Sequence, residues 1–245
     1  MILTIAIIKG GTGKSTTAAA LAQAGAYAGK KILAIDLDPQ GNLTAFLDGD
    51  PTGRGSFNLL HGETPDNVIQ RTGQGVYLAA AGPDLATEQS RPGSAKRLAQ
   101  AIEPLKGLYD YIIIDTPPNM GELTLNALQA SEGLIIPART ESGSLQGLYT
   151  ITDIAGEIRR SNPGLNLIRT VITDLETRSG HDRFMLQTIR DKAQEAGAPV
   201  LAEIRHAAAI RGAQLMRQSI FAYAPRSRPA KECRQLFELI NNMAN

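Results

Sequence analysis

The sequence predicts an α/β fold, a doubly wound and mostly parallel sheet with helices on both of its faces. Short apolar runs alternate with longer helical patterns along the chain, a glycine-rich turn follows the first run, and aspartates follow two later ones. With 245 residues, of which 42% are hydrophobic, the chain is within the range of one domain with a substantial core. We therefore expect a single domain over residues 1–245.

The first apolar run, Ile2 to Ile8, is expected to be a buried strand, and Thr16 to Ala28 a helix. The turn between them consists of Lys9, Gly10, Gly11, Thr12, Gly13, Lys14, Ser15 and Thr16. Glycines let backbone N–H groups converge on phosphate oxygens, and the helix N-terminus adds its positive dipole end. We therefore expect a P-loop, with Lys14 on the β- and γ-phosphates and Ser15 as a ligand of Mg²⁺.

The strict pattern G-x-x-x-x-G-K-[ST] needs glycine where this chain has Ile8, which leaves K-G-G-x-G-K-[ST]. That variant resembles the deviant Walker A box of the ParA/MinD superfamily of P-loop ATPases, and Lys9 matches its signature lysine. The resemblance implies ATP and Mg²⁺ as cofactors, all eight turn residues as nucleotide contacts, and a homodimer in which Lys9 touches the partner's phosphates. From the residues alone, a lysine that merely ends a strand in solvent is an equal alternative.

A second strand, Ile32 to Ile35, runs into Asp36 and Asp38 at the edge where ligands bind in open α/β sheets. Two acids at alternate positions also begin turns and cap helices, so this alternative remains. The segment DLDPQGN resembles a ParA-family box. The resemblance implies that Asp38 supports the attack of water and that Asp36 lies nearer the metal.

The segment YDYIIIDTPPNMGELTLNAL begins with an apolar strand that delivers Asp115 to the same edge. A carboxylate there can hold Mg²⁺ through water, because Mg²⁺ keeps several waters and takes few protein ligands. The alternative is a strand that ends at the N-cap of a helix. The segment resembles the Walker B and switch II region of the ParA family, which implies catalytic and metal-binding roles for Asp115. Thr116 to Met120 would couple the phosphate state to the dimer surface.

The other elements follow from apolar runs and turn signals. Residues 43–75 are expected to be loops with one small helix, and Asp84 to Pro104 to be mostly helix, interrupted at Pro92-Gly93. Further strands are expected at Val76 to Ala81, Gly133 to Pro137, Leu165 to Thr173 and Pro199 to Ile204, and further helices at Ser144 to Arg160, Arg183 to Ala196 and Ala230 to Met243. The last helix is expected to bury Leu236, Phe237, Leu239, Ile240 and Met243 in the core.

Composition excludes several classes of protein. The single Cys233 excludes an internal disulfide framework and any cysteine-based metal cluster within one protomer. It also excludes an iron protein whose cluster bridges two subunits, because such a cluster needs two thiolates from each subunit. One cysteine fits a protein of the reducing cytosol. The three histidines are far apart, so we expect no histidine metal site. The apolar start leads directly into the glycine-rich turn and is expected to be a strand rather than a signal peptide, and no run reaches about 20 apolar residues.

Charge is unevenly distributed although the net charge is only +1. Residues 205–234 contain seven Lys or Arg residues and a single acid, Glu232. Such an excess indicates either a patch that binds a polyanion or a solvated face, and both interpretations remain. The candidates for DNA contacts are Arg205, Arg211, Arg217, Arg226 and Arg228.

The segment Tyr223 to Arg228 matches the late Y-x-P-x-S pattern of the same family, so the chain resembles the ParA/Soj group in its short form. One departure concerns residues 204–209, which read IRHAAA where family members often read I-P-R-N-x-R. Family contacts to adenine therefore do not transfer residue by residue. Thr173, Asp174 and residues 205–211 are the candidates for base recognition.

The resemblance implies an ATPase that partitions a plasmid or chromosome and acts in the cytoplasm on nucleoid DNA. An ATP-driven sandwich dimer would bind DNA nonspecifically, and a ParB-like partner would stimulate hydrolysis. Three alternatives remain: a MinD-like membrane-surface ATPase, suggested by the apolar C-terminal helix, an ATPase that positions another cargo, and a small-molecule ligase on the same fold.

Overall fold

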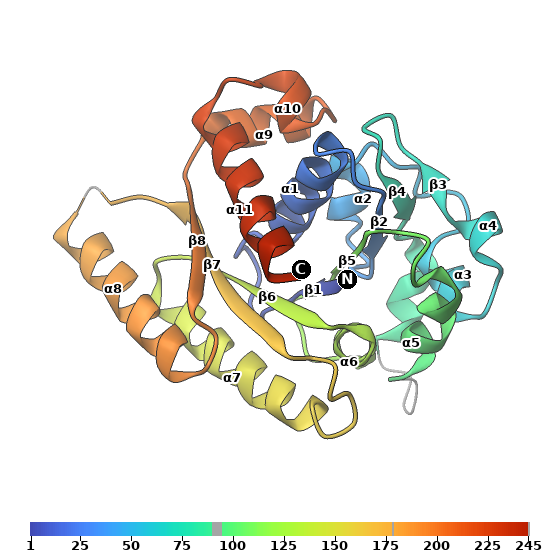
Figure 1. The fold of residues 1–245 in the computed structure, drawn as a ribbon, viewed down its shortest axis with the longest axis horizontal. Coiled ribbons are helices and arrows are strands. Elements are labelled where there is room, and N and C mark those ends of the chain that lie inside the picture. The colour runs from blue at the N-terminus through green and yellow to red at the C-terminus, as the bar shows by residue number, and fades with distance from the viewer. Residues whose placement is uncertain (90–94, 178, 245) are drawn as a thin grey trace.

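A computed structural model describes residues 1–89, 95–177 and 179–244. One sheet crosses the molecule, and helices cover both of its faces (Figure 1). The predicted α/β fold with a mostly parallel sheet is confirmed.

The sheet has the order β3-β4-β2-β5-β1-β6-β7-β8, and among the described strands only the short β3–β4 pair is antiparallel. Each parallel connection therefore crosses over the sheet, which is what places helices on the faces. The strands are β1 (Ile2–Ile5), β2 (Ile32–Asp36), β3 (Gln70–Arg71), β4 (Tyr77–Ala79), β5 (Tyr111–Asp115), β6 (Gly133–Ala138), β7 (Leu167–Leu175) and β8 (Val200–Arg205).

Helices of very different lengths connect these strands. The α-helices are α1 (Lys14–Tyr27), α2 (Asn42–Phe46), α3 (Ser56–Leu60), α4 (Pro65–Val68), α5 (Arg97–Ile102), α6 (Glu122–Ala130), α7 (Ser142–Ile158), α8 (Gly180–Glu195), α9 (Ala208–Leu215), α10 (Ile220–Tyr223) and α11 (Arg228–Ala244). The 3₁₀ turns η1 (Pro83–Glu88) and η2 (Glu103–Leu105) flank α5.

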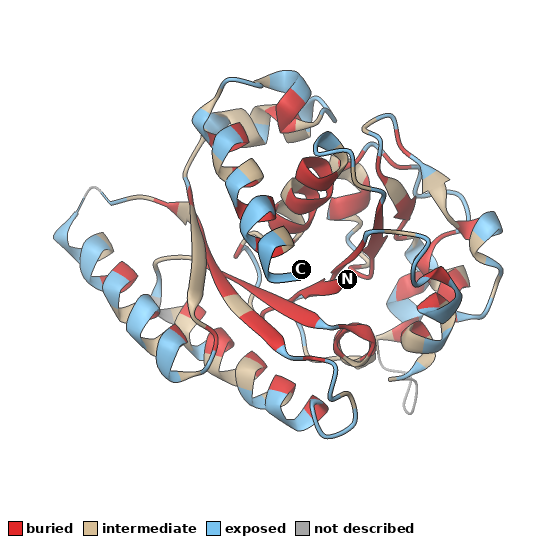
Figure 2. Cartoon of the chain, viewed as in Figure 1, coloured by how far each residue is buried: buried red, intermediate tan, exposed pale blue. Residues whose placement is uncertain are grey.

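The core forms two layers, one on each side of the sheet (Figure 2). Leu3 and Ile5 of β1 belong to the layer that contains α1 and α11, whereas Ile2 belongs to the layer that contains α5 and α6. Successive side chains of a strand point to opposite faces, so a strand covered on both faces must be apolar throughout. This is why the central strands read as continuous apolar runs.

Strand register fixes the position of the acidic residues. Asp115 at the end of β5 lies opposite Ile5 on one side and opposite Asp36 at the end of β2 on the other. Since β1 leads directly into the glycine-rich turn, parallel pairing brings both aspartates beside that turn.

Several element predictions need correction. The strand predicted over Ile2 to Ile8 ends at Ile5, and the helix predicted over Asp84 to Pro104 consists of η1, the short α5 and η2. The predicted interruption at Pro92-Gly93 lies outside the described residues. Helices α9 and α10 have no counterpart among the predicted elements.

The predicted apolar stripe of α11 is correct only in part. Leu236, Phe237 and Ile240 are buried, but Leu239 and Met243 are 39% and 41% exposed. The helix packs on α1 through the face that also carries Ala230 and Cys233. Leu239 and Met243 are four residues apart and lie together beside that face, so they share a solvent-facing flank.

The contact between α1, β2 and α11 gives the first prediction. A Cβ added at Gly25 would lie 2.6 Å from Ile32 Cδ1 and 2.9 Å from Phe237 Cε2. Gly25→Ala should therefore destabilise the protein by about 1–3 kcal/mol through overpacking, measured as urea unfolding. Gly156→Ala in α7 is the control, because nothing lies within 4 Å of its added Cβ. That variant should stabilise the protein by up to about 1 kcal/mol, and equal effects of the two changes would contradict this packing.

Candidate functional site

The glycine-rich turn has the backbone shape of a phosphate cradle. Gly11 and Gly13 have φ angles of 74° and 88°, in the left-handed region that glycine adopts without strain. Gly13 is the N-cap of α1, and no described side chain caps that helix. Because a Cβ at Gly10 or Gly11 would meet no atom of a described residue within 4 Å, there is open space beside the loop. The free N–H groups of the first helical turn are therefore available to an anion.

Lys14 extends from the first turn of α1 into this cradle. Its side chain is buried, and Nζ donates a hydrogen bond to the Lys9 carbonyl oxygen at 3.0 Å. Burial lowers the pKa of Lys14, while the charges of Asp115 and Asp38 oppose that shift. An anionic ligand would compensate this buried ammonium, as expected of a phosphate-binding lysine.

Asp115 is fully buried, and neither of its carboxylate oxygens has a hydrogen-bond partner among the described residues. Its pKa is raised well above 3.8, first by burial and then by the charge of Asp36. Ser15 and Lys14 oppose the rise, although the Ser15 hydroxyl does not meet the geometry of a hydrogen bond. An unsatisfied buried carboxylate beside a serine hydroxyl fits Mg²⁺ and its water shell.

Mg²⁺ would not be held by a dense protein cluster here. The described residues contain no group of three or more His, Cys, Asp or Glu side chains arranged to hold a metal ion. This suits an ion that is bound by one or two protein groups together with phosphates.

Asp36 is buried beside Asp115, but its oxygens are occupied. Oδ2 accepts hydrogen bonds from the backbone N–H and the hydroxyl of Thr44, both at 2.8 Å, and Oδ1 accepts one from the Asp38 N–H at 3.1 Å. Burial raises the pKa of Asp36 to about 6 despite these bonds. Asp36 therefore holds the turn that follows β2, and its role as a metal ligand stays a prediction.

Asp38 lies at the start of that turn and is nearly buried. Its Oδ1 accepts a hydrogen bond from the Gln40 N–H at 3.0 Å. Because the charge of Asp38 acts on Lys14, the structure brings this carboxylate to the phosphate cradle. A carboxylate that supports the attack of water must lie beside the phosphates, as Asp38 does. The catalytic role of Asp38 itself stays a prediction.

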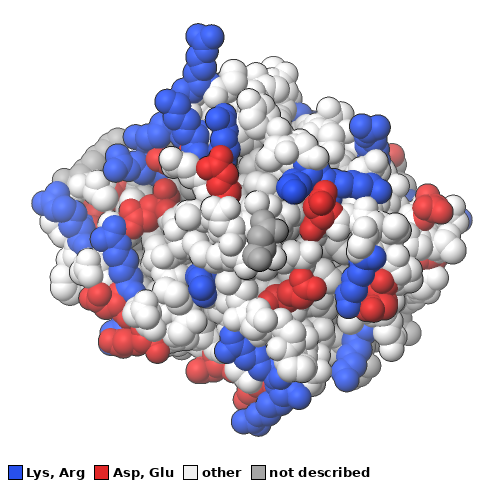
Figure 3. Space-filling model, viewed as in Figure 1, with Lys and Arg blue, Asp and Glu red and all other residues white. Residues whose placement is uncertain are grey.

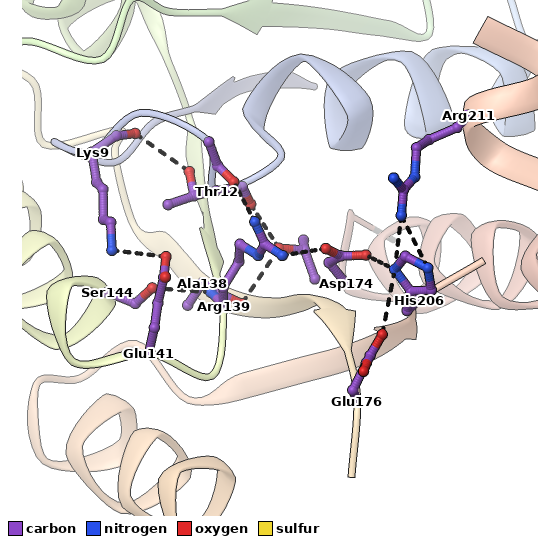
Figure 4. Close-up of polar contacts among 12 residues, drawn as sticks. Lys9, Thr12, Ala138, Arg139, Glu141, Ser144, Asp174, Glu176, His206 and Arg211 are labelled. Atoms are coloured by element: carbon purple, nitrogen blue, oxygen red, sulfur yellow. Dashed lines mark hydrogen bonds and ion pairs between the residues drawn. The ribbon is translucent and has the colours of Figure 1, made fainter. Parts of the chain in front are cut away.

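Lys9 does not end in open solvent. Its Nζ forms an ion pair with Glu141 at 2.7 Å, and the side chain runs along Gly143 in the first turn of α7 (Figure 4). A Cβ at Gly143 would collide with the end of the Lys9 side chain, so a larger residue there would displace Lys9 from this path. The sequence prediction did not include Glu141, because its position relative to Lys9 depends on how α7 packs against the segment that follows β1.

A second group of polar contacts lies on the other side of the cradle. Thr173 Oγ1 donates to the Thr12 carbonyl oxygen at 2.6 Å, which ties the end of β7 to the loop. The next residue, Asp174, is paired with Arg139 and with His206 (Figure 4). The structure thus brings Thr173 and Asp174 to the loop together with His206 of the predicted segment 205–211, and it adds Arg139, which the sequence prediction did not include.

The five predicted DNA contacts, Arg205, Arg211, Arg217, Arg226 and Arg228, are all exposed. They do not form one group. Arg205 and Arg211 line a cavity beside the P-loop, whereas Arg217 pairs with Asp48 and Arg228 with Glu232. In Figure 3, basic side chains gather at the upper left, near α9 and the first turns of α11.

No described helix is both long and apolar enough to cross a membrane.

Comparison with known proteins places this site in a family. A family model described as an AAA domain matches residues 1–167. Chromosome-partitioning ATPase Soj of Thermus thermophilus is 38% identical over 177 residues, which cover 70% of this chain and 68% of that protein. Sporulation initiation inhibitor protein Soj of Bacillus subtilis is 32% identical over 249 residues and covers 94% of both chains.

Solved structures of similar fold include an enzyme of a different class. Cobyrinic acid a,c-diamide synthase from Mycobacterium smegmatis, with a bound ATP analog and magnesium, superposes with a TM-score of 0.83 and 30% identity. The match covers 100% of this chain and 96% of that one. The fold alone therefore does not separate a partitioning protein from a small-molecule synthase.

The unpartnered carboxylate of Asp115 gives the second prediction. At pH values above the folded pKa of Asp115, Asp115→Asn should raise the melting temperature of the ligand-free protein by about 2 °C or more, because it removes a buried carboxylate charge that no described hydrogen-bond donor satisfies. The raised pKa means that the folded protein binds this proton more tightly than the unfolded chain. The stability contribution of Asp115 is therefore lost as pH rises from 3.8 through the folded pKa.

The gain in melting temperature should accordingly be largest above the folded pKa and should disappear near pH 4. Melting curves from pH 4 to 8 measure it, and Asp153→Asn at an exposed position of α7 is the control. A gain of equal size at every pH would show that the charge of Asp115 is not its cause.

Proposed function

Because this chain belongs to the AAA domain family, and within it to the ParA/MinD-type ATPases, we propose that it is a Mg²⁺-dependent ATPase that partitions DNA. The observation that carries the proposal is the combined position of Lys9, Lys14 and Asp115 around one open phosphate cradle. Two curated relatives named as Soj cover most of the chain, and one of them is named as a chromosome-partitioning ATPase.

ATP occupies the cradle in this proposal. The triphosphate accepts hydrogen bonds from the N–H groups of the loop and compensates the buried charge of Lys14. Mg²⁺ is held by Ser15 and, through water, by Asp115, and when bound it neutralises charge on the β- and γ-phosphates. Asp38 lies close enough to act on Lys14 electrostatically and positions the attacking water.

Lys9 provides the link to dimerisation. In the single chain its ammonium is paired with the half-exposed Glu141 rather than with a group of the same nucleotide site. In the dimer, Lys9 exchanges that partner for the more highly charged phosphates of the other subunit. An exposed ion pair is worth at most about 1 kcal/mol, so the exchange has a small cost.

DNA binds to a basic surface formed by α9, the start of α11 and the segments beside them, which carry Arg217 and Arg226. A dimer presents two such surfaces at once, which raises affinity through effective concentration without any new contact. ATP therefore controls DNA binding by controlling valency. A ParB-like partner that stimulates hydrolysis then releases the chain from DNA.

A membrane-surface function is less well supported. The exposed side chains Leu239 and Met243 of α11 are the apolar pair that a membrane would bind. Their neighbour Glu238 is acidic and exposed, and α11 has no Lys or Arg after Arg234. An anionic lipid surface attracts a helix with basic residues beside its apolar face, so the charge around Leu239 and Met243 does not favour a membrane as the partner.

Three variants separate the steps of the ATPase cycle and give the third prediction. Lys14→Ala should abolish ATP binding, because the buried cation that compensates the phosphates is lost. Asp38→Ala should bind ATP and dimerise but not hydrolyse it. Lys9→Ala should bind ATP yet fail to dimerise, as measured by light scattering with ATP and Mg²⁺. If Lys9→Ala dimerised and hydrolysed ATP like the unchanged protein, the role of Lys9 in the dimer would be wrong.

The fourth prediction concerns DNA. Retention of nonspecific DNA should be strong with ATP and weak with ADP or no nucleotide, and log affinity should fall steeply with log salt. The double variant Arg217→Ala/Arg226→Ala should lower the salt slope by about 2, at about 0.9 per phosphate contact. Both residues lie outside the cavity beside the P-loop, so ATP binding should be unchanged.

Arg54→Ala/Arg160→Ala removes the same charge from exposed positions in other elements and is the control. Equal retention in all three nucleotide states would refute control by valency. Hydrolysis that required a small-molecule acceptor and ignored DNA would instead favour a synthase like the structural neighbour.

A further inference from the structure

Two exposed apolar side chains, which we call the apolar tip, lie next to each other at the C-terminal end of α9. Leu215 is 84% exposed, more than any other large apolar side chain of the described residues, and Met216 is 61% exposed. A single exposed apolar residue is common on protein surfaces, whereas an adjacent pair held in place by its surroundings indicates a binding surface. Neither residue lines the cavity beside the P-loop, so the nucleotide site does not explain the apolar tip.

The backbone that follows the apolar tip has a strained conformation. The Gln218 N–H donates to the Ala213 carbonyl oxygen at 2.9 Å, and the Arg217 N–H donates to the Gln214 carbonyl oxygen at 3.1 Å. This pair of bonds ends a helix with one left-handed residue, which is usually glycine. Here that residue is Arg217, with a φ of 51°. Such a conformation is uncommon for a residue other than glycine, and strain of this kind clusters at ligand contacts and other functional sites.

Side chains from two other elements hold the end of α9. Gln74, in the turn between β3 and β4, donates to the Arg217 carbonyl oxygen at 3.1 Å. Gln23 of α1 donates to Gln74 Oε1 at 2.8 Å and accepts a hydrogen bond from the Ile220 N–H at 3.3 Å. The apolar tip therefore projects from a support that is tied to the core, so that little conformational entropy is lost when it enters a partner.

Basic residues accompany the apolar tip. Arg217 directly follows it, is 61% exposed, and is paired with the half-exposed Asp48 at 3.6 Å. An exposed pair of this kind exchanges its partner at little cost. A Cβ at Gly212 of α9 would lie 2.6 Å from the Tyr223 hydroxyl oxygen, so Tyr223 lies against α9, and Arg226 follows three residues later. The helix that carries the apolar tip thus belongs to the region where basic side chains gather (Figure 3).

Apolar side chains beside arginines match the chemistry of duplex DNA. Arginine binds backbone phosphates without regard to sequence. Leucine and methionine are among the apolar residues that can insert between base pairs from the minor groove, which unstacks one step and bends the duplex. Because Leu215 is 84% exposed, it projects from the surface and suits a narrow slot of this kind. An interface with another protein would instead need a broad apolar core.

We propose that the apolar tip is a wedge that enters the minor groove of duplex DNA and partly unstacks one base step, while Arg217 and Arg226 hold the flanking phosphates. This proposal rests on the proposed DNA binding and goes beyond it, because neutralisation of phosphates alone does not depend on the flexibility of a base step. The wedge costs least at a TA step, which kinks easily, and most in a stiff A-tract.

The test compares two duplexes of equal length and base composition, with ATP and Mg²⁺ at one salt concentration. One duplex is rich in TA steps, and the other consists of A-tracts without a TA step. Fluorescence anisotropy measures affinity, and 2-aminopurine placed in a TA step measures unstacking. The unchanged protein should bind the TA-rich duplex about fivefold more tightly than the A-tract duplex, and it should raise the fluorescence of 2-aminopurine.

Leu215→Ser/Met216→Ser removes apolar surface and no charge. It should bind the TA-rich duplex about tenfold more weakly and the A-tract duplex about twofold more weakly, which abolishes the preference, and it should keep the salt slope. The fluorescence of 2-aminopurine should then no longer rise. Leu215→Met/Met216→Leu, which keeps two flexible apolar side chains, should bind like the unchanged protein. Leu239→Ser/Met243→Ser, which removes the same residue types from the exposed flank of α11, is the control and should change neither affinity.

Several results would overturn the wedge. These are equal affinity of the unchanged protein for the two duplexes, a 2-aminopurine signal that does not rise, and a serine double variant at α9 that binds the TA-rich duplex like the unchanged protein. The last result would leave the apolar tip to a protein partner. An equal loss in the α11 control would show that general surface hydrophobicity is the cause. If the unchanged protein bound neither duplex with ATP, the proposed DNA binding itself would fail, and the wedge with it.

Discussion

Two buried carboxylates and one buried ammonium, placed side by side at one edge of a parallel sheet, are the constraint on which the site depends. Asp36 and Asp115 face each other in register at the ends of β2 and β5, and Lys14 enters from the first turn of α1. Charges removed from water must be paired or neutralised. The protein neutralises this group only in part, and an anion with its metal ion completes it.

The surrounding residues form hydrogen bonds with Asp36 but not with Asp115. The Thr44 hydroxyl donates a hydrogen bond to Asp36 and accepts one from the Ala81 N–H. Thr44 therefore connects the turn after β2 to the end of β4. Asp115 has no such partner among the described residues and stays available. Two polar chains then diverge from the loop, one through Lys9 to Glu141 and one through Thr173 to Asp174. The first leads to the dimer contact that we propose, and the second lines the cavity beside the P-loop.

The sequence predicted the parts of this site that depend on local pattern. Apolar runs followed by glycine or aspartate identify a strand end and the groups at the sheet edge, so Gly13, Lys14 and Asp115 were found without coordinates. Glu141 was missed because it acts through a residue far away in sequence, and only the packing of α7 brings it to Lys9. His206 was predicted only as part of residues 205–211, because its pairing with Asp174 depends on how β8 packs beside β7. The predicted burial of Leu239 was wrong for a similar reason. Periodicity shows that a helix has an apolar side, but it does not show how much of that side contacts the rest of the core.

Proton release on nucleotide binding tests the central claim most directly. At pH 6, near the raised pKa of Asp36, that carboxylate carries a proton for part of the time in the free protein. Burial also raises the pKa of Asp115, which must lose any bound proton to face Mg²⁺. Calorimetric titration with ATP and Mg²⁺ in two buffers of different ionisation enthalpy measures the protons exchanged. The account predicts net release that diminishes in Asp115→Asn. Proton uptake, or no exchange at all, would contradict it.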